Sequence, residues 1–484
     1  MATEIQCCWS RLNQGETMTL NPLVDSNVGV TMTSKTGFNM KKFTALLIIF
    51  LHTSQAQIPN EVKFEIDQRV KHELNASIAF GMLTEGETDF YVAGWQNRES
   101  KTPATTATVY EMGSISKTFT ALLLAQQIIN EQVSLNDPVQ RWWPQPFALQ
   151  DASGQLVTLK HLVTHTSGLP RLPKNLSVFN QDPYAEYDRQ QLLAGVKMTT
   201  IKAVGKDLAY SNFGFGLLGE TLAAQAGQSF EHLVAEKLLQ PLALQHTYQS
   251  LYAVPDALLA TGYRGNKATT AWQFKALAGA GWLRTDIRDL LTYGSYLLNP
   301  EAAKVDPQLT QALRLVTQAQ HQGEVQVGLG WFIRDDIIWH NGATAGFNAI
   351  LMISPETQTV VAGITNGTES IEDIALHLLK PERPMTDHGF PVAIETAALT
   401  AYTGTYVRPE NKQSMTIKLL DNRLYFAAEK QPKQAMTYIG DDTFKLGFIK
   451  ARIQFQRDPA GHVNGLELTG WGEPQSYQLI NRSP

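Results

Sequence analysis

Cysteine is almost missing from this chain of 484 residues, whose only thiols are Cys7 and Cys8. Both precede a candidate export signal, so the mature protein is expected to have no thiol at all. It therefore needs no disulfide, and a cysteine-based metal site is excluded. No apolar segment precedes the pair, which also excludes a lipidation site that follows a signal sequence.

Charge is sparse and nearly balanced. Charged residues make up 18% of the chain, the formal net charge is −5 and the sequence pI is about 6.1. No basic block is present, which argues against a nucleic-acid partner. With 43% hydrophobic residues the composition is typical of a globular protein, and the length allows two or three domains.

Long apolar runs are missing as well, apart from a short run at residues 43–51. Two lysines precede this run, and Ser54 and Ala56 offer small residues at the −3 and −1 positions of a cleavage site. Residues 40–56 are therefore predicted to be a secretory signal peptide, too short for a membrane span. Residues 1–39 are then an upstream extension from a wrongly chosen start codon, and the mature protein is periplasmic or secreted. The alternative is an uncleaved membrane anchor.

What the sequence does contain is a Ser-x-x-Lys motif, at Ser114 and Lys117, at the start of an apolar, helix-forming run. A serine hydroxyl needs a base before it becomes a good nucleophile. A spacing of three places the lysine amine on the same helical face as the hydroxyl. The helix start also directs free backbone N–H groups and its positive end at the serine. This pattern indicates an acyl-transfer nucleophile, although the motif alone also fits a helix-capping serine.

Two further motifs follow in order. Tyr210 and Asn212 form the one Tyr-x-Asn in the sequence, and His340 and Gly342 form one of two His-x-Gly motifs. The other, at His321, lies in a polar, glutamine-rich stretch that is typical of a surface loop. His340 instead ends a β-like apolar run and is followed by a small-residue turn and a second strand. We therefore interpret His340 as the third element of the site.

The order of predicted elements places these motifs in one α+β domain. A helix at residues 58–72 and two strands between residues 78 and 94 precede Ser114, and the β pattern returns between residues 327 and 364. The stretch from about 139 to 300 is predicted to be mostly helical with long loops. Strands at both ends indicate one shared sheet, with an α-rich lobe between them.

With these motifs, the chain resembles the serine β-lactamase and penicillin-binding protein superfamily over about residues 60–380. It is most similar to the class C β-lactamase branch, which includes DD-peptidases, D-aminopeptidases and esterases. The resemblance implies the β-lactamase/transpeptidase-like fold, an antiparallel sheet flanked by helices plus an α-rich lobe, for a domain at residues 57–380. The site then lies between the two lobes, with His340 on an edge strand. Phrases typical of the branch stand between the motifs in the expected order, at residues 162–170, 239–247 and 279–285.

The same resemblance implies the chemistry of the site. Ser114 is the nucleophile that forms an acyl-enzyme, Lys117 keeps its hydroxyl reactive, and Tyr210 is a second proton carrier. A lysine must lose its proton to act as a base, which burial beside cationic or polar groups favours. No cofactor is expected, and no residues have the spacing of metal ligands, so no metal is expected either.

The remaining site residues are expected to hold the substrate. Asn212 hydrogen-bonds Lys117 and the substrate amide. The backbone N–H groups of Ser114 and Ala343 form the oxyanion hole. Gly342 lets the substrate approach its strand without a side chain in the way.

His340 departs from the class C β-lactamases, which carry a lysine at this position. An imidazole is mostly neutral at pH 7, whereas the lysine is a permanent cation for the substrate carboxylate. His-x-Gly occurs in D-aminopeptidase-like and peptidase-like relatives, so efficient β-lactam hydrolysis is in doubt while the acyl-transfer machinery is intact. Three other histidines, His161, His165 and His246, are interpreted as loop or core residues.

We therefore expect an exported serine hydrolase that cleaves an amide or β-lactam bond of a small-molecule or peptide substrate. A class C-like β-lactamase and a D-amino-acid peptidase both fit, and a carboxylesterase is the alternative within the same fold. The alternative of another class is a penicillin-binding sensor or cell-wall-binding protein that is acylated and stalls. The deacylation base implied by Tyr210 argues against that alternative.

A second domain is predicted after a linker at residues 381–394. Residues 395–484 contain short alternating runs separated by turn residues, which predicts a small all-β barrel or sandwich. Its opening, at residues 402–406, resembles the lipocalin-like appendage found on some members of this superfamily. No catalytic pattern is present in it, and a stabilising or substrate-channelling role is expected.

Overall fold

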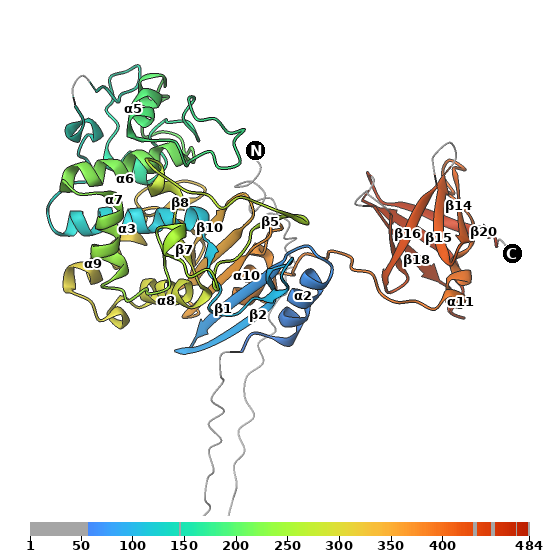
Figure 1. Ribbon diagram of the computed structural model, residues 1–484. Coiled ribbons are helices and arrows are strands. Elements are labelled where there is room, and N and C mark those ends of the chain that lie inside the picture. The colour runs from blue at the N-terminus through green and yellow to red at the C-terminus, as the bar shows by residue number, and fades with distance from the viewer. Residues whose placement is uncertain (1–56, 145–146, 429–432, 447–450, 471, 483–484) are drawn as a thin grey trace, which may run out of the picture. The chain divides into compact units, whose positions relative to one another are not determined.

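The chain folds into two compact units, with the boundary between Pro384 and Met385. Each unit has its own hydrophobic core. The predicted extension at 1–39 and signal peptide at 40–56 lie outside the described residues. The computed structural model describes residues 57–482 except 145–146, 429–432, 447–450 and 471 (Figure 1).

The first unit is built on an eight-stranded sheet to which both ends of the unit contribute. The early strand β1 runs antiparallel to the late strand β12, with Ile78 opposite Thr365 and Thr84 opposite Thr359. Figure 1 shows the blue early strands side by side with the orange late ones. In sheet order the strands are β3 (Thr102–Pro103), β2 (Glu87–Asn97), β1 (Ser77–Thr84), β12 (Thr359–Thr365), β11 (Asn348–Ser354), β10 (Ile337–Ala343), β9 (Phe332–Arg334) and β8 (Gln326–Val327).

Helices cover the centre of this sheet on both faces. All seven residues of β12 are buried, and successive residues of a strand point to opposite faces. Helix α8 (Ile287–Leu298) packs on β1, β11 and β12, and α2 (Asn60–Lys71) and α10 (Glu372–Leu379) also pack on the sheet. The buried Arg69 of α2 donates to Asp373 of α10 at 2.6 and 3.0 Å, which ties the two ends of the unit together.

An α-rich lobe lies between the two groups of strands in the sequence, as expected. Helix α3 is buried along almost its whole length and packs against α6 and α9. Among the described residues, no helix is both long and apolar enough to cross a membrane. The shared sheet and this helical lobe confirm the fold expected from the resemblance. The helices of the lobe are α3 (Ser116–Ile129), α4 (Leu159–Val163), α5 (Arg189–Lys197), α6 (Asn212–Ala226), α7 (Phe230–Val234) and α9 (Pro307–Val316).

Strand β10 is not the edge strand that we expected for His340. It lies between β9 and β11 in the sheet, and β11 pairs with it as far as Ala343. The short strand β9, however, pairs only with Ile337–Trp339. From His340 onward β10 packs instead against the 3₁₀ turn η1 (Gly113–Ile115). The expectation was wrong for the strand as a whole, because three residues of β9 cover its first half.

The second unit is a closed eight-stranded barrel, which confirms the predicted all-β domain. Asp421 and Asn422, both with positive φ, form a tight turn between the strands at Ser414–Leu420 and Arg423–Ala428. Inward aromatic side chains, including Phe444 and Phe455, pack against one another at 5.5 Å and fill its core. Its strands are β13 (Gly404–Val407), β14 (Ser414–Leu420), β15 (Arg423–Ala428), β16 (Gln434–Gly440), β17 (Thr443–Leu446), β18 (Arg452–Arg457), β19 (Val463–Thr469) and β20 (Gln475–Asn481).

Part of the predicted linker contacts this barrel. Asp387 forms an ion pair with Arg452 of β18. The backbone N–H of Val392 donates to the Tyr438 carbonyl of β16 at 2.9 Å. Residues 387–392 therefore belong to the second unit.

Candidate active site

The site is built where the turn that carries Ser114 meets strand β10. Gly113 has a left-handed φ of +51° and opens the turn. A Cβ atom on Gly113 would lie 2.8 Å from the backbone N of Ala343. A Cβ atom on Gly342 would lie 3.0 Å from the backbone N of Ser114 and would collide with the Met112 carbonyl. Only glycine lets the two backbones pack this closely.

This packing corrects the reason that we expected for Gly342. The space that a side chain would need is occupied by the backbone of η1, not reserved for an approaching substrate. The same packing brings the backbone N–H groups of Ser114 and Ala343 to one junction. Ser114 is partly exposed and Ala343 is exposed, so a substrate can reach this junction. Its use as an oxyanion hole stays a prediction.

Lys117 lies completely buried on α3, one turn after Ser114. Its Nζ atom donates hydrogen bonds to Ser114 Oγ at 3.0 Å and to the Ala280 carbonyl at 2.5 Å. Burial, and then the positive charge of Arg171, lowers the pKa of Lys117 well below its usual value. A neutral amine can donate to the Ala280 carbonyl and, with the direction of the 3.0 Å contact reversed, accept the Ser114 hydroxyl proton on its lone pair.

Tyr210 reaches the same place from the loop before α6. The next residue, Ser211, caps α6 by accepting a hydrogen bond from a backbone N–H of the first turn, which sets where the loop ends. Lys117 Nζ lies 4.9 Å from the centre of the Tyr210 ring, and Arg171 Cζ lies 5.1 Å from it. The structure thus brings the predicted nucleophile, lysine and tyrosine together, and adds Arg171, which the sequence analysis missed.

Asn212 is near this group but does not make the contact that we expected. Both hydrogen bonds of the Lys117 amine go to Ser114 and Ala280. The side chain of Asn212 hydrogen-bonds Tyr184, whose pKa is raised by burial. The Asn212 Oδ1 atom is buried and has no hydrogen-bond partner among the described residues, so it can still accept a hydrogen bond from a substrate amide.

His340 lies at the site but cannot serve as a cation there. Its side chain is completely buried, and burial, followed by the charge of Lys117, lowers its pKa to about 3. Its Nδ1 atom is 2.6 Å from the Asn341 carbonyl, so Nδ1 carries the hydrogen and Nε2 is an acceptor. The His340 ring centre lies 6.4 Å from that of Tyr210. A neutral, buried imidazole differs from the permanent cation that the resemblance to the class C enzymes places at this position.

His165, interpreted from the sequence as a loop or core residue, is in contact with Tyr210. Its ring centre lies 4.4 Å from the Tyr210 ring centre, and its side chain is 1% exposed. Burial, and then the charge of Lys117, lowers the pKa of His165 well below its usual value. No charge pattern in the sequence marks His165. Its contact with Tyr210 depends on a left-handed turn, in which His165 has a φ of +58°.

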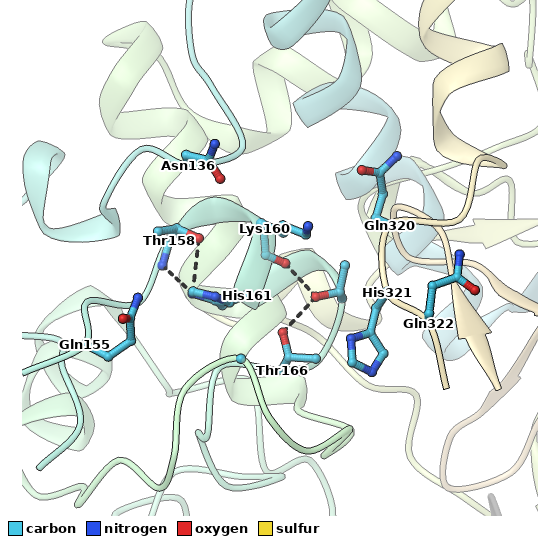
Figure 2. Close-up of a pocket in the computed structure, with 11 residues that line it drawn as sticks. Asn136, Gln155, Thr158, Lys160, His161, Thr166, Gln320, His321 and Gln322 are labelled. Carbon is cyan, nitrogen blue, oxygen red and sulfur yellow. Dashed lines mark hydrogen bonds between the residues drawn. The ribbon is translucent and has the colours of Figure 1, made fainter. Parts of the chain in front are cut away.

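His321, the histidine of the second His-x-Gly motif, lines a separate pocket of about 490 Å³ (Figure 2). Ser114, Lys117 and Tyr210 are not among the residues that line it. Figure 2 shows His161 turned toward Thr158, at the start of α4, on the opposite side of the pocket from His321. The pocket is polar and includes no carboxylate. Its lining residues are Asn136, Gln155, Thr158, Lys160, His161, Thr164, Thr166, Gly205, Gln320, His321 and Gln322.

One group in the described part of the chain has the composition of a metal site: His246, Asp286 and Asp289. Its carboxylates already have partners. Asp286 caps α8 by accepting from the Asp289 N–H at 2.9 Å, and it also pairs with Arg288. Asp289 accepts from the His246 N–H at 2.7 Å and from Thr247 at 3.0 Å. These contacts explain the group as a helix cap.

Fold and site together define a serine hydrolase of the β-lactamase/transpeptidase-like fold. The chain matches the Beta-lactamase family over residues 66–379 and a domain of unknown function, DUF3471, over residues 391–481. It belongs to the Beta-lactamase family, since that match covers more than half of its length. The resemblance stated from the motifs is confirmed.

Curated relatives and solved structures agree with this assignment. A β-lactamase of Escherichia coli is 26% identical over 371 residues, which cover 76% of this chain and 90% of that protein. A β-lactamase of Pseudomonas fluorescens is 31% identical over 264 residues, which cover 53% and 69%. The octameric penicillin-binding protein homologue of Pyrococcus abyssi shares the fold with a TM-score of 0.63, 19% identity and coverage of 86% and 99%. A class C β-lactamase mutant does so with a TM-score of 0.59, 23% identity and coverage of 66% and 96%.

Proposed function

We propose that this protein hydrolyses an amide, β-lactam or ester bond through an acyl-enzyme on Ser114. The observation that carries the proposal is the 3.0 Å contact between Ser114 Oγ and the buried amine of Lys117, beside the Tyr210 ring. A hydroxyl next to an unprotonated amine has the base that nucleophilic attack requires.

In the proposed reaction, the Lys117 lone pair takes the hydroxyl proton as Ser114 Oγ bonds to the substrate carbonyl. The negative charge on the carbonyl oxygen is stabilised by the N–H groups of Ser114 and Ala343. Tyr210 passes a proton to the leaving group, and a water molecule then attacks the acyl carbonyl and gives a proton to Tyr210, while Lys117 returns its proton to Ser114 Oγ as the acyl group leaves. General acid–base catalysis of this kind contributes about 100- to 10,000-fold to the rate.

The buried, neutral His340 supports a substrate that does not depend on a cation at this position. A D-aminoacyl peptide or an ester meets this condition better than a β-lactam with its carboxylate. We therefore place D-amino-acid peptidase first, β-lactamase second and carboxylesterase as the alternative within the fold. A stalled penicillin-binding sensor is disfavoured because Tyr210 is available for deacylation.

We also propose that the mature enzyme begins at Gln57 and is exported to the periplasm or secreted. The basis is the signal-like sequence at residues 40–56. Detection of an N-terminus at Gln57 in the protein recovered from the cell envelope or medium would support it, and an intact residue 40–56 segment there would contradict it.

The experiment that tests the catalytic proposal combines turnover with intact mass. The mature protein is incubated with nitrocefin, D-aminoacyl peptides and short-chain esters, and with a fluorophosphonate probe. Ser114→Ala should abolish labelling and turnover, while Ser177→Ala, an exposed serine, should leave both unchanged. Sustained turnover without Ser114, or labelling of the Ser114→Ala variant, would refute the nucleophile. A stable adduct without turnover would favour the sensor.

A further inference from the structure

His165 contacts the Tyr210 loop at three points. The backbone N–H of Ala209 donates to the His165 carbonyl at 2.8 Å. The backbone N–H of Ser211 donates to His165 Nδ1 at 3.1 Å. The imidazole ring lies against the Tyr210 ring, with centres 4.4 Å apart. One residue therefore binds the neighbours of Tyr210 on both sides and the tyrosine itself.

The way in which His165 is held makes these contacts specific. A φ of +58° is uncommon for a residue with a side chain, and it lets the carbonyl and the ring of one residue face the same loop. Because Nδ1 accepts a hydrogen bond, the neutral ring carries its hydrogen on Nε2. The ring is also fixed by Phe215 of α6, at 4.8 Å between centres. The buried Nε2 has no partner among the described residues.

We propose that His165 is a positioning residue for Tyr210, which holds the phenol in register with Lys117 and Ser114. The inference rests on the proposed acyl-transfer function. Tyr210 precedes α6 and belongs to no strand or helix, so its place depends on the contacts of its neighbours. A shift of about 1 Å in a catalytic group can lower the rate by about 100-fold.

The chain offers an internal comparison in His161, four residues earlier. His161 Nδ1 accepts a hydrogen bond from the Thr158 N–H at 3.1 Å, the same kind of bond at the same distance. That bond caps α4 and faces the pocket of Figure 2 instead of the Tyr210 loop. Replacement of His161 removes a similar bond without a direct effect on Tyr210, so it controls for lost stability.

The test separates the ring of His165 from its hydrogen-bond acceptor. His165→Phe keeps a ring but leaves the buried Ser211 N–H without an acceptor. His165→Asn keeps an acceptor near the Nδ1 position and tolerates the left-handed backbone. Both variants, and His161→Phe, are made in the mature enzyme and in a Tyr210→Phe background. Turnover of the best ester or peptide substrate, fluorophosphonate labelling of Ser114 and thermal unfolding are measured for each.

We expect His165→Phe to lower kcat by about 10- to 100-fold with little change in KM, because a buried N–H loses its partner and the loop shifts. His165→Asn should recover activity to within about 10-fold of the wild type, and His161→Phe should lower stability but not kcat. In the Tyr210→Phe background, His165→Phe should lower kcat by less than about 3-fold. An effect that acts through the phenol is not additive with loss of the phenol.

Three results would overturn the inference while the wild type turns over substrate. The first is wild-type kcat in His165→Phe. The second is an equal loss in His161→Phe. The third is a loss of kcat from His165→Phe that is as large in the Tyr210→Phe background as in the wild type, which indicates a general structural effect. A wild type with neither turnover nor Ser114 labelling would refute the proposed function itself, and the inference with it.

Discussion

Replacement of Gly342 by alanine tests the junction that builds the site. The added Cβ atom would collide with the Met112 carbonyl and lie 3.0 Å from the Ser114 backbone N. Both are backbone atoms, so no flexible side chain can move aside. Strand β10 and turn η1 must then separate by more than about 1 Å before the contact becomes an ordinary van der Waals distance.

The separation affects catalysis more than folding. The N–H of Ala343 follows Gly342 directly, so the two proposed oxyanion donors move apart. Loss of one such donor lowers kcat by about 100- to 1,000-fold in comparable sites. Overpacking of this kind lowers the free energy of unfolding by about 1–3 kcal/mol. We therefore expect a folded protein with a slightly lower melting temperature and a kcat reduced by about 100-fold or more.

The assay compares Gly342→Ala with Gly323→Ala by turnover of a chromogenic ester and by thermal unfolding. Gly323 is a suitable control because a Cβ there meets only Val325 O at 3.4 Å and His321 Nε2 at 3.8 Å, and its φ is not left-handed. Gly323→Ala should have the kcat and the melting temperature of the wild type. A Gly342→Ala enzyme with wild-type kcat would refute both the close packing of β10 on η1 and the oxyanion role of its amide.

Three further predictions follow from the site. Lys117→Met should reduce kcat/KM by about 100- to 10,000-fold, because it removes the proposed base, with the exposed Lys174→Met as control; unchanged acylation of the nucleophile would contradict this. Burial lowers the pKa of His340 from 6.5 to about 3, so the unfolded chain binds more protons and stability falls as the pH drops from 6.5 towards 3. The melting temperature of the wild type should therefore fall more steeply over this range than that of His340→Gln, and parallel curves would contradict the burial. EDTA should not alter activity, because Asp286 and Asp289 already have partners; a loss that zinc restores would contradict that reading.

Local spacing was enough to predict some of this structure. Lys117 follows Ser114 by three positions, and the first turns of a helix place both side chains on one face, where they are in contact at 3.0 Å. The barrel strands follow the alternating pattern and the turn residues closely, because hairpins between neighbouring strands depend on local sequence. The order of the motifs and the strands at both ends also predicted the shared sheet.

The meeting of Tyr210 and His340 with Lys117 depends on long-range packing. The number of residues between two positions does not tell how far apart they lie in the folded chain. Only the resemblance to a known family anticipated that these three residues meet. The contact expected of Asn212 failed for this reason. Asn212 was expected to bond Lys117, but the Ala280 carbonyl from a distant loop takes that place.

The sequence by itself predicted Ser114 and Lys117 as a pair, the two kinds of domain and the family, because these depend on local periodicity and on motifs. Only the tertiary structure decided the charges and the supports of the site. Burial in the folded chain lowers the pKa of His340 and keeps its imidazole neutral. His165 acts on Tyr210 because a left-handed turn directs it at a loop far along the chain. Burial and backbone approach are properties of neighbours far apart in sequence, so they arise only when the chain is folded.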